Sequence, residues 1–132
     1  MVVRIDRTSP DPLYLQIRSQ IVMAIARSEL VPGDVLPSVR SLASDLGINL
    51  HTVNKAYAVL RDEGYVTMHG RSGAYVADST NESKKDAEEG RARLDDALYA
   101  LALEHRAQGG GEDEYLACAR SQADRAYEGD EQ

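Results

Sequence analysis

Residues 38–64 read SVRSLASDLGINLHTVNKAYAVLRDEG, which is two short helical patterns separated by a glycine turn. Ser38 is a good N-cap for the first helix, and Gly47 in the left-handed conformation can end it. Asn49 can cap the second helix, and Gly64 stops it. Because two helices joined by a tight glycine-containing turn form a helix-turn-helix, the stretch predicts that motif.

The apolar residues of both helices recur at helical spacing and so mark the faces that pack inward. In the first helix, over residues 38–46, these residues are Val39, Leu42, Ala43 and Leu46. In the second helix they are Val53, Ala56, Tyr57 and Leu60. Ile48 lies in the turn, where it can fill the angle between the helices.

A further helix precedes this pair. Asp11 is its N-cap candidate, and Pro12 suits the first helical position. The apolar face is formed by Leu13, Ile17, Ile21, Ala24 and Ile25, and we expect the helix to end near Ser28. Pro32, Gly33 and Asp34 then form a turn.

Two short β-forming segments, residues 65–68 and 74–77, follow the helices, and glycines between them allow a hairpin loop. Three helices and a hairpin make a winged helix-turn-helix domain, which we place at residues 10–78. The segment 79–85 is polar without apolar periodicity and is interpreted as a junction.

The remaining residues, 79–132, predict a tail of two helices. The first runs from Arg91 to Arg106, and the second opens with the acidic residues Glu112–Glu114, which suit the positive end of a helix dipole. Two amphipathic helices on a short loop cannot bury all of their apolar surface against each other, so this surface must pack on another part of the protein. We expect it to pack on a second copy of the chain, which makes residues 79–132 a dimerisation tail. The expected dimer contacts are Leu94, Leu98, Leu101 and Leu116. Docking of the tail on its own winged helix is the alternative.

The charge divides at the same place. Residues 1–78 hold eight basic and eight acidic residues, whereas residues 79–132 hold seven basic and fourteen acidic ones, so the net charge of −7 belongs to the tail. A protein with a net negative charge is unusual among nucleic-acid binders, which tend to carry a basic excess. Because residues 1–78 are neutral and only the tail is acidic, the net negative charge does not exclude DNA binding. It predicts that the tail faces away from any DNA and that affinity for non-specific DNA is modest.

Several classes of protein are excluded by what the chain does not contain. One cysteine, Cys118, allows neither an intramolecular disulfide nor a Cys-based zinc site, and we expect it to be buried or half-buried on a helix. No apolar run is long enough to span a membrane and no signal peptide is visible, so we expect a cytoplasmic protein without a membrane partner.

Catalysis requires titratable groups that converge on one site, and this chain offers none. The three histidines, His51, His69 and His105, lie on different predicted elements, and no catalytic motif appears. We therefore expect neither an enzyme nor a cofactor. Metal sensing through His105 and acidic neighbours is a weak alternative.

The residues quoted so far resemble the GntR family of bacterial transcription regulators. The resemblance covers about residues 10–78 and is carried by the segments 12–17, 30–43, 46–49, 52–57 and 63–66. It implies a DNA-binding winged helix. The short helical tail is similar to that of the YtrA subfamily, in which the tail mainly dimerises the protein, and Asn54-Lys55-Ala56-Tyr57 also fits that subfamily.

Two departures from the subfamily concern base preference. The subfamily commonly has proline and asparagine where this chain has Leu50 and His51, and its wing usually reads Gly-Thr-Phe-Val where residues 73–76 read Gly-Ala-Tyr-Val. The resemblance implies a homodimer that binds a two-fold symmetric double-stranded operator, most simply as a repressor. The operator sequence, the regulated genes and any small-molecule effector are left open.

Helical spacing places His51, Lys55, Ala58 and Asp62 of the second helix of the pair opposite its apolar face, with Thr52 and Asn54 on the two flanks. The N-terminal half of this face is expected in the major groove, where Asn54 can bind adenine or the sugar-phosphate backbone. His51 and Thr52 can bind base edges or phosphates, and Lys55 a phosphate. A surface ion pair between Lys55 and Asp62, or an unpaired Lys55, is the alternative.

Further DNA contacts are expected from the preceding helix and from the wing. The resemblance implies that Arg40 reaches DNA, with a surface charge near Asp45 as the alternative, and Ser38 can combine capping with a phosphate bond. In the wing, Arg71 can enter the minor groove while His69 and Gly70 meet the backbone; a solvated tip is the alternative. Tyr57 and Tyr75 are interpreted as packing residues.

The competing function is a winged-helix module that binds another protein without reading DNA. The missing basic excess motivates it, and an apolar surface on the second helix of the pair would support it. The polar residues His51, Asn54 and Lys55 favour DNA.

Overall fold

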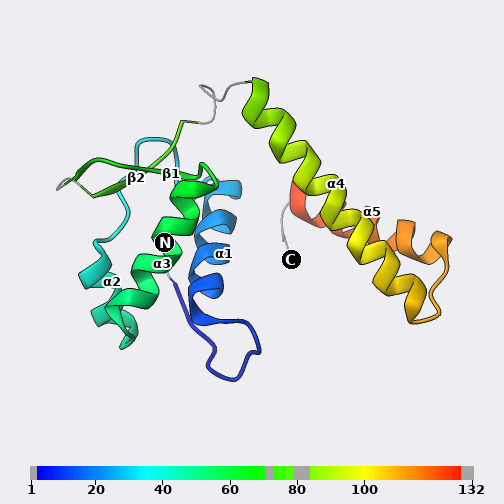
Figure 1. Ribbon diagram of the computed structural model, residues 1–132, viewed down its shortest axis with the longest axis horizontal. Helices are drawn as coiled ribbons and strands as arrows, with labels where there is room; N and C mark the ends of the chain where they lie inside the picture. Colours follow the sequence, from blue (N-terminus) through cyan, green and yellow to red (C-terminus); the bar gives the residue numbers. More distant parts are fainter. Residues whose placement is uncertain (1–2, 71–72, 79–83, 129–132) are drawn as a thin grey trace. The chain divides into compact units, whose positions relative to one another are not determined.

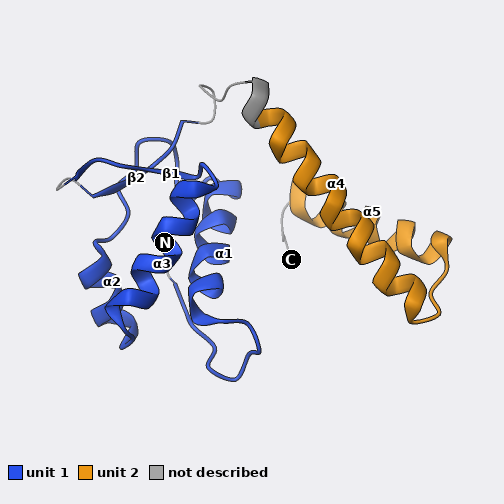
Figure 2. Ribbon diagram, viewed as in Figure 1, with its two compact units in different colours: residues 1–81 blue, residues 82–132 orange. Residues whose placement is uncertain are grey.

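The computed structural model describes residues 3–70, 73–78 and 84–128, and the chain divides into two compact units. Unit 1 is Met1–Asn81 and unit 2 is Glu82–Gln132 (Figure 2). The elements are α1 (Leu13–Ala26), α2 (Val39–Leu46), α3 (Leu50–Asp62), β1 (Val66–Met68), β2 (Ala74–Val76), α4 (Lys84–Ala107) and α5 (Glu112–Glu128) (Figure 1). The predicted fold class is confirmed, because the chain is mostly helical and a small antiparallel hairpin follows the helix-turn-helix in the sequence.

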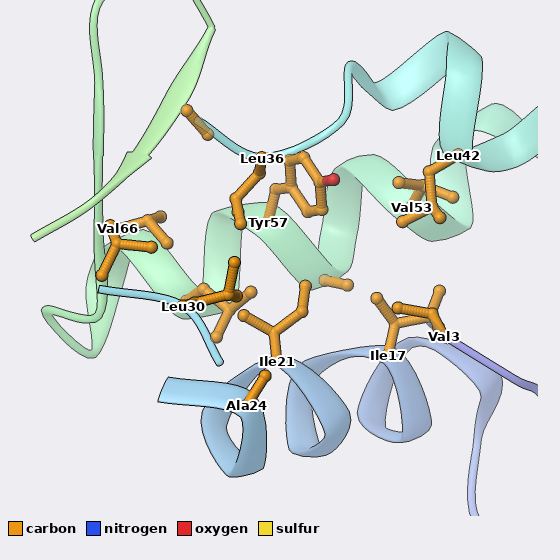
Figure 3. Close-up of a cluster of buried hydrophobic side chains, with 14 of the residues drawn as sticks. Val3, Ile17, Ile21, Ala24, Leu30, Leu36, Leu42, Val53, Tyr57 and Val66 are labelled. Atoms are coloured by element: carbon orange, nitrogen blue, oxygen red, sulfur yellow. The ribbon is translucent and has the colours of Figure 1, made fainter. Parts of the chain in front are cut away.

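The core of unit 1 lies between α1 and α3 (Figure 3). Ile17 and Ile21 of α1 and Val53 and Leu60 of α3 have no exposed surface, as the helical spacing of the sequence predicts. The other buried apolar residues are Val3, Ala24, Leu30, Leu36, Leu42, Ala43, Ala56, Tyr57, Val66, Ala74 and Val76. This packing sets the position of α3 relative to the rest of the domain.

The hairpin is anchored to the chain that precedes α2. β1 and β2 pair with Val66 opposite Val76 and Met68 opposite Ala74. On the other side of β2, Leu36 N donates to Ala74 O at 2.9 Å and Val76 N donates to Asp34 O at 2.8 Å. The base of the wing is therefore held from both sides.

An N-terminal arm, residues 3–8, extends the domain beyond the predicted start at residue 10. Asp6 N donates to Gln16 Oε1 at 2.7 Å, and Arg4 N donates to Gln20 Oε1 at 2.8 Å. The two glutamines are one helical turn apart on α1, so they face the arm together. Val3, at the start of the arm, is buried in the core.

The prediction that Asp11 caps α1 is wrong. Pro12 is the N-cap residue, with φ −56° and ψ 147°, and no side chain accepts a hydrogen bond from the first turn. The carbonyl of Pro12 starts the helical ladder by accepting from the N–H groups of Leu15 and Gln16, both at 3.1 Å. An extended proline suits this position because its fixed φ is compatible with a cap.

The first tail helix begins earlier than predicted, at Lys84 rather than Arg91. Its extra turns lack a repeating apolar residue, so hydrophobic periodicity could not detect them, although Lys, Glu and Ala are good helix formers. Part of the predicted junction is thus helical, and residues 79–83 lie outside the described residues. The second tail helix begins at Glu112 as predicted.

Cys118 is exposed on α5, so the prediction that it is buried or half-buried is wrong within this chain. The reason is that the described part of α5 has no buried residue. None of the described helices is both long and apolar enough to cross a membrane.

Tyr57 connects α3 to the segment before α2, because its hydroxyl donates to Pro37 O at 2.7 Å. Burial raises the pKa of Tyr57 to about 12 from an ordinary value of 10.0. The folded state therefore favours the neutral phenol. Its contribution to stability is complete below the unfolded pKa and is lost as the pH rises through the folded one.

We expect Tyr57→Phe to lower the free energy of unfolding at neutral pH by about 1 kcal/mol, through the lost hydrogen bond. The variant should also lose stability less steeply than the wild type between pH 10 and about 12. Denaturant titrations at several pH values measure both effects. Tyr99→Phe, at a tyrosine that is 68% exposed, is the control. Parallel alkaline slopes in wild type and Tyr57→Phe would contradict the prediction.

Candidate nucleic-acid interface

Two side-chain caps and one left-handed glycine set the geometry of the helix-turn-helix. Ser38 Oγ accepts from Ser41 N at 3.0 Å at the start of α2, and Asn49 Oδ1 accepts from His51 N at 2.7 Å at the start of α3. Gly47 ends α2 with φ 66° and ψ 37°. These are the local signals predicted from the sequence, and together they fix where α3 begins.

α3 carries the predicted contact residues His51, Thr52, Asn54 and Lys55. His51, Asn54 and Lys55 are exposed, and Thr52 is half-buried beside them. His51 and Lys55 lie opposite the buried residues Val53, Ala56, Tyr57 and Leu60, and Thr52 and Asn54 lie on the two flanks, as helical spacing requires. The surface is polar, which suits base edges and phosphates better than an apolar protein partner.

Lys55 does not pair with Asp62, which is one of the two alternatives drawn from the sequence. Its Nζ lies 4.1 Å from the centre of the Tyr14 ring on α1. Asp62 instead pairs with its neighbour Arg61, at 3.1 Å. Sequence reasoning missed Tyr14, although its spacing from Ile17 and Ile21 places it on the side of α1 that faces α3.

α2 presents Ser38 and Arg40 at the surface. Both are exposed, and within the described parts of the chain Arg40 makes no ion pair, with Asp45 or otherwise. Ser38 Oγ uses a lone pair for the cap, so its hydroxyl hydrogen is left for another acceptor. From the N-terminal arm, Arg7 Nη2 donates to Gly47 O at 3.4 Å and places a second cation beside the turn.

The wing brings His69 against its own strands. His69 Nε2 lies 3.0 Å from Thr67 Oγ1, and the imidazole meets the half-buried Tyr75 ring edge-on at 5.0 Å between centroids. Gly70 follows with a positive φ of 55° and is exposed. Arg71, the predicted minor-groove contact, lies outside the described residues.

A partly buried ion pair steadies the far end of α3. Arg18 Nε and Nη2 on α1 donate to the two carboxylate oxygens of Glu63 at 2.8 and 3.2 Å. The Glu63 hydrogen bond raises the pKa of Arg18. The Arg18 guanidinium also lies 5.6 Å from the centre of the Tyr65 ring at the base of the wing.

In unit 2 the four predicted dimer contacts are exposed. The exposed fractions are 54% for Leu94, 41% for Leu98, 55% for Leu101 and 54% for Leu116. α4 and α5 are joined by a hydrogen bond from the Tyr115 hydroxyl to Leu98 O at 2.9 Å. Near the turn, His105 Nε2 approaches Glu114 Oε1 at 2.9 Å, without the angles of a hydrogen bond.

The described residues contain no cluster of His, Cys, Asp or Glu that could hold a metal ion, so nothing there supports metal sensing through His105. An open pocket of about 550 Å³ lies at the turn between α4 and α5, where Ala102, His105, Tyr115 and Leu116 are among the lining residues.

Comparison with known proteins agrees with the family resemblance of the sequence. The model of the family described as bacterial regulatory proteins, gntR family, matches residues 13–76. YtrA from Sulfolobus acidocaldarius, a GntR-family transcription factor, is 37% identical with a TM-score of 0.63, and the match covers 93% of this chain and 97% of that one. A transcriptional antiterminator from Listeria monocytogenes EGD-e has a TM-score of 0.78 at 26% identity, over 96% and 92% of the two chains.

Among curated proteins, the transcriptional repressor YtrA of Bacillus subtilis is 40% identical over 79 residues, which is 59% of this chain and 60% of the repressor. The match spans 58% to 62% of the length of the first three curated relatives, all of which are named transcriptional regulators.

Proposed function

This chain belongs to the gntR family of bacterial regulatory proteins, and on that premise we propose that it is a sequence-specific DNA-binding transcription regulator. The observation that carries the proposal is the polar, solvent-facing side of α3, where His51, Asn54 and Lys55 are exposed on a capped helix. An α-helix with this kind of surface fits the major groove of DNA.

The residues divide into base readers and backbone contacts. Asn54 binds adenine bidentately in the major groove, while His51 and Thr52 bind base edges or phosphates. Lys55, Arg40 and Ser38 bind the phosphate backbone. In the wing, His69 and Gly70 meet the backbone and Arg71 enters the minor groove.

We further propose that unit 2 pairs two copies of the chain. Its described part holds no buried hydrophobic residue, whereas leucines on α4 and α5 are 41% to 55% exposed. An uncovered apolar surface of this kind marks an interaction site. A second copy of the same two helices would cover it symmetrically, and a symmetric dimer reads a two-fold symmetric operator.

The direction of regulation that we propose is repression. The curated relative from Bacillus subtilis is named a repressor, and a dimer bound across an operator can block transcription by occupancy. The competing function is binding to another protein without specific DNA reading. The following experiment distinguishes this function from DNA binding.

Two adjacent residues of α3 test the proposal as a matched pair. Selection of binding sites from random DNA should yield a palindrome with the wild-type chain. Lys55→Ala should weaken binding to all sequences about equally and reduce the slope of log affinity against log salt by about one. Asn54→Ala should leave that slope unchanged and relax base preference at one position in each half-site.

Equilibrium binding over a range of salt concentrations measures the slope, and a second selection with each variant measures base preference. Selection that yields no sequence with the wild type would reject specific DNA reading and favour a protein partner. If the slope of log affinity against log salt is unchanged in Lys55→Ala, the phosphate contact of Lys55 is rejected, but the proposed function is not.

A further inference from the structure

The side chains of Tyr14 and Lys55 join the first turn of α1 to the middle of α3. Lys55 Nζ lies 4.1 Å from the centre of the Tyr14 ring. This distance is well inside the range of about 6 Å within which an ammonium is attracted to the face of an aromatic ring. Tyr14 is half-buried and packs against the hydrophobic core, so the ring is itself held in place.

An aromatic ring holds a cation without cancelling its charge. A carboxylate partner would neutralise Lys55 and would have to be displaced before a phosphate could bind. Asp62, the acidic residue of α3, is paired with Arg61, and no ion pair with Lys55 occurs among the described residues. Lys55 therefore keeps its full positive charge at an exposed position.

We propose that Tyr14 is a positioning residue for DNA binding, which holds the Lys55 ammonium in place before the phosphate arrives. A free lysine side chain samples many rotamers and loses that freedom when it binds. Restricting the side chain in the unbound protein lowers this cost of binding. The proposal rests on the proposed function, because Lys55 is taken to be a phosphate contact.

The contact itself can be tested without DNA. The chain has three lysines, Lys55, Lys84 and Lys85, so their ε-methylene signals are readily assigned by NMR. The Tyr14 ring should shift the Lys55 signal upfield of the other two in the wild type and in Tyr14→Phe. Tyr14→Leu should return it to the position of an ordinary lysine. A Lys55 signal that is the same in wild type and Tyr14→Leu would overturn the proposal.

The effect on binding is tested by a double-mutant cycle with the selected operator, at a temperature below the unfolding of every variant. Tyr14→Leu should weaken binding about threefold to fivefold, as expected for the loss of an exposed cation–π contact. It should cause no further loss when Lys55 is already alanine. Tyr14→Phe keeps the ring and should bind like the wild type.

Two results would overturn the positioning role while leaving DNA binding intact. One is an equal loss from Tyr14→Leu with and without the Lys55 side chain, since the effect would then be structural. The other is a loss in Tyr14→Phe as large as in Tyr14→Leu, since the hydroxyl would then make the contact with DNA. Absence of any operator for the wild type would instead reject the proposed function, and the NMR measurement would still decide whether Tyr14 holds Lys55.

Discussion

Removal of residues 79–132 is expected to convert a dimer into a monomer and to lower affinity for a two-half-site operator by about 100-fold or more. The reason is that a dimer binds its second half-site intramolecularly, at a high effective concentration, whereas separate monomers must each be recruited from solution. The truncated chain should still fold, because every buried hydrophobic residue of the described chain lies in unit 1.

Mass measurement in solution and binding to fragments with one or two half-sites check this result. Affinity for a single half-site should be nearly the same in the full and truncated chains. In the full chain, Leu101→Glu should favour the monomer, and Glu104→Gln on the same helix is the matched control, since both positions are exposed. A truncated chain that remains a dimer would exclude the tail as the main interface.

Of the substitutions proposed here, Ile21→Ala is expected to lower the free energy of unfolding the most, by about 2–5 kcal/mol. Ile21 is completely buried where α1 packs on α3, so the substitution leaves a cavity beside α3. A domain of this size has a total stability of about 5–15 kcal/mol, and the variant should therefore unfold at a clearly lower temperature.

Thermal and denaturant unfolding measure the loss. Met23→Ala removes a similar volume two residues along the same helix, where the side chain is 44% exposed, and should change stability by no more than about 0.5 kcal/mol. Equal losses in the two variants would mean that the packing of α1 on α3 does not stabilise the domain as the structure indicates.

The parts of the fold that depend on neighbours in the chain could be predicted from the sequence. The caps at Ser38 and Asn49 and the left-handed Gly47 each involve residues no more than a few positions apart, and they are where the sequence predicts. The second tail helix was found for the same reason, since its acidic first turn follows a run of glycines. The early start of α4 was missed because its first turns lack an apolar repeat.

Among the other predictions that failed or stayed incomplete, one concerns neighbouring residues and two concern partners distant in sequence. Asp11 looked like a cap from its own properties, but Pro12 takes that role. Cys118 is predicted to be buried or half-buried, yet it is exposed, and the described part of α5 has no buried residue. The domain start at residue 10 left out an arm whose hydrogen bonds go to glutamines 10 and 16 residues away.

By itself, the sequence determined the helix-turn-helix and which side of α3 is polar, because helical periodicity and caps act over one or two turns. Only the tertiary structure decided what each polar residue contacts. It placed Tyr14 beneath Lys55 and left Asp62 with Arg61. The physical reason is that a side chain on a helix surface has several partners within reach, and the choice among them depends on which other helix packs alongside.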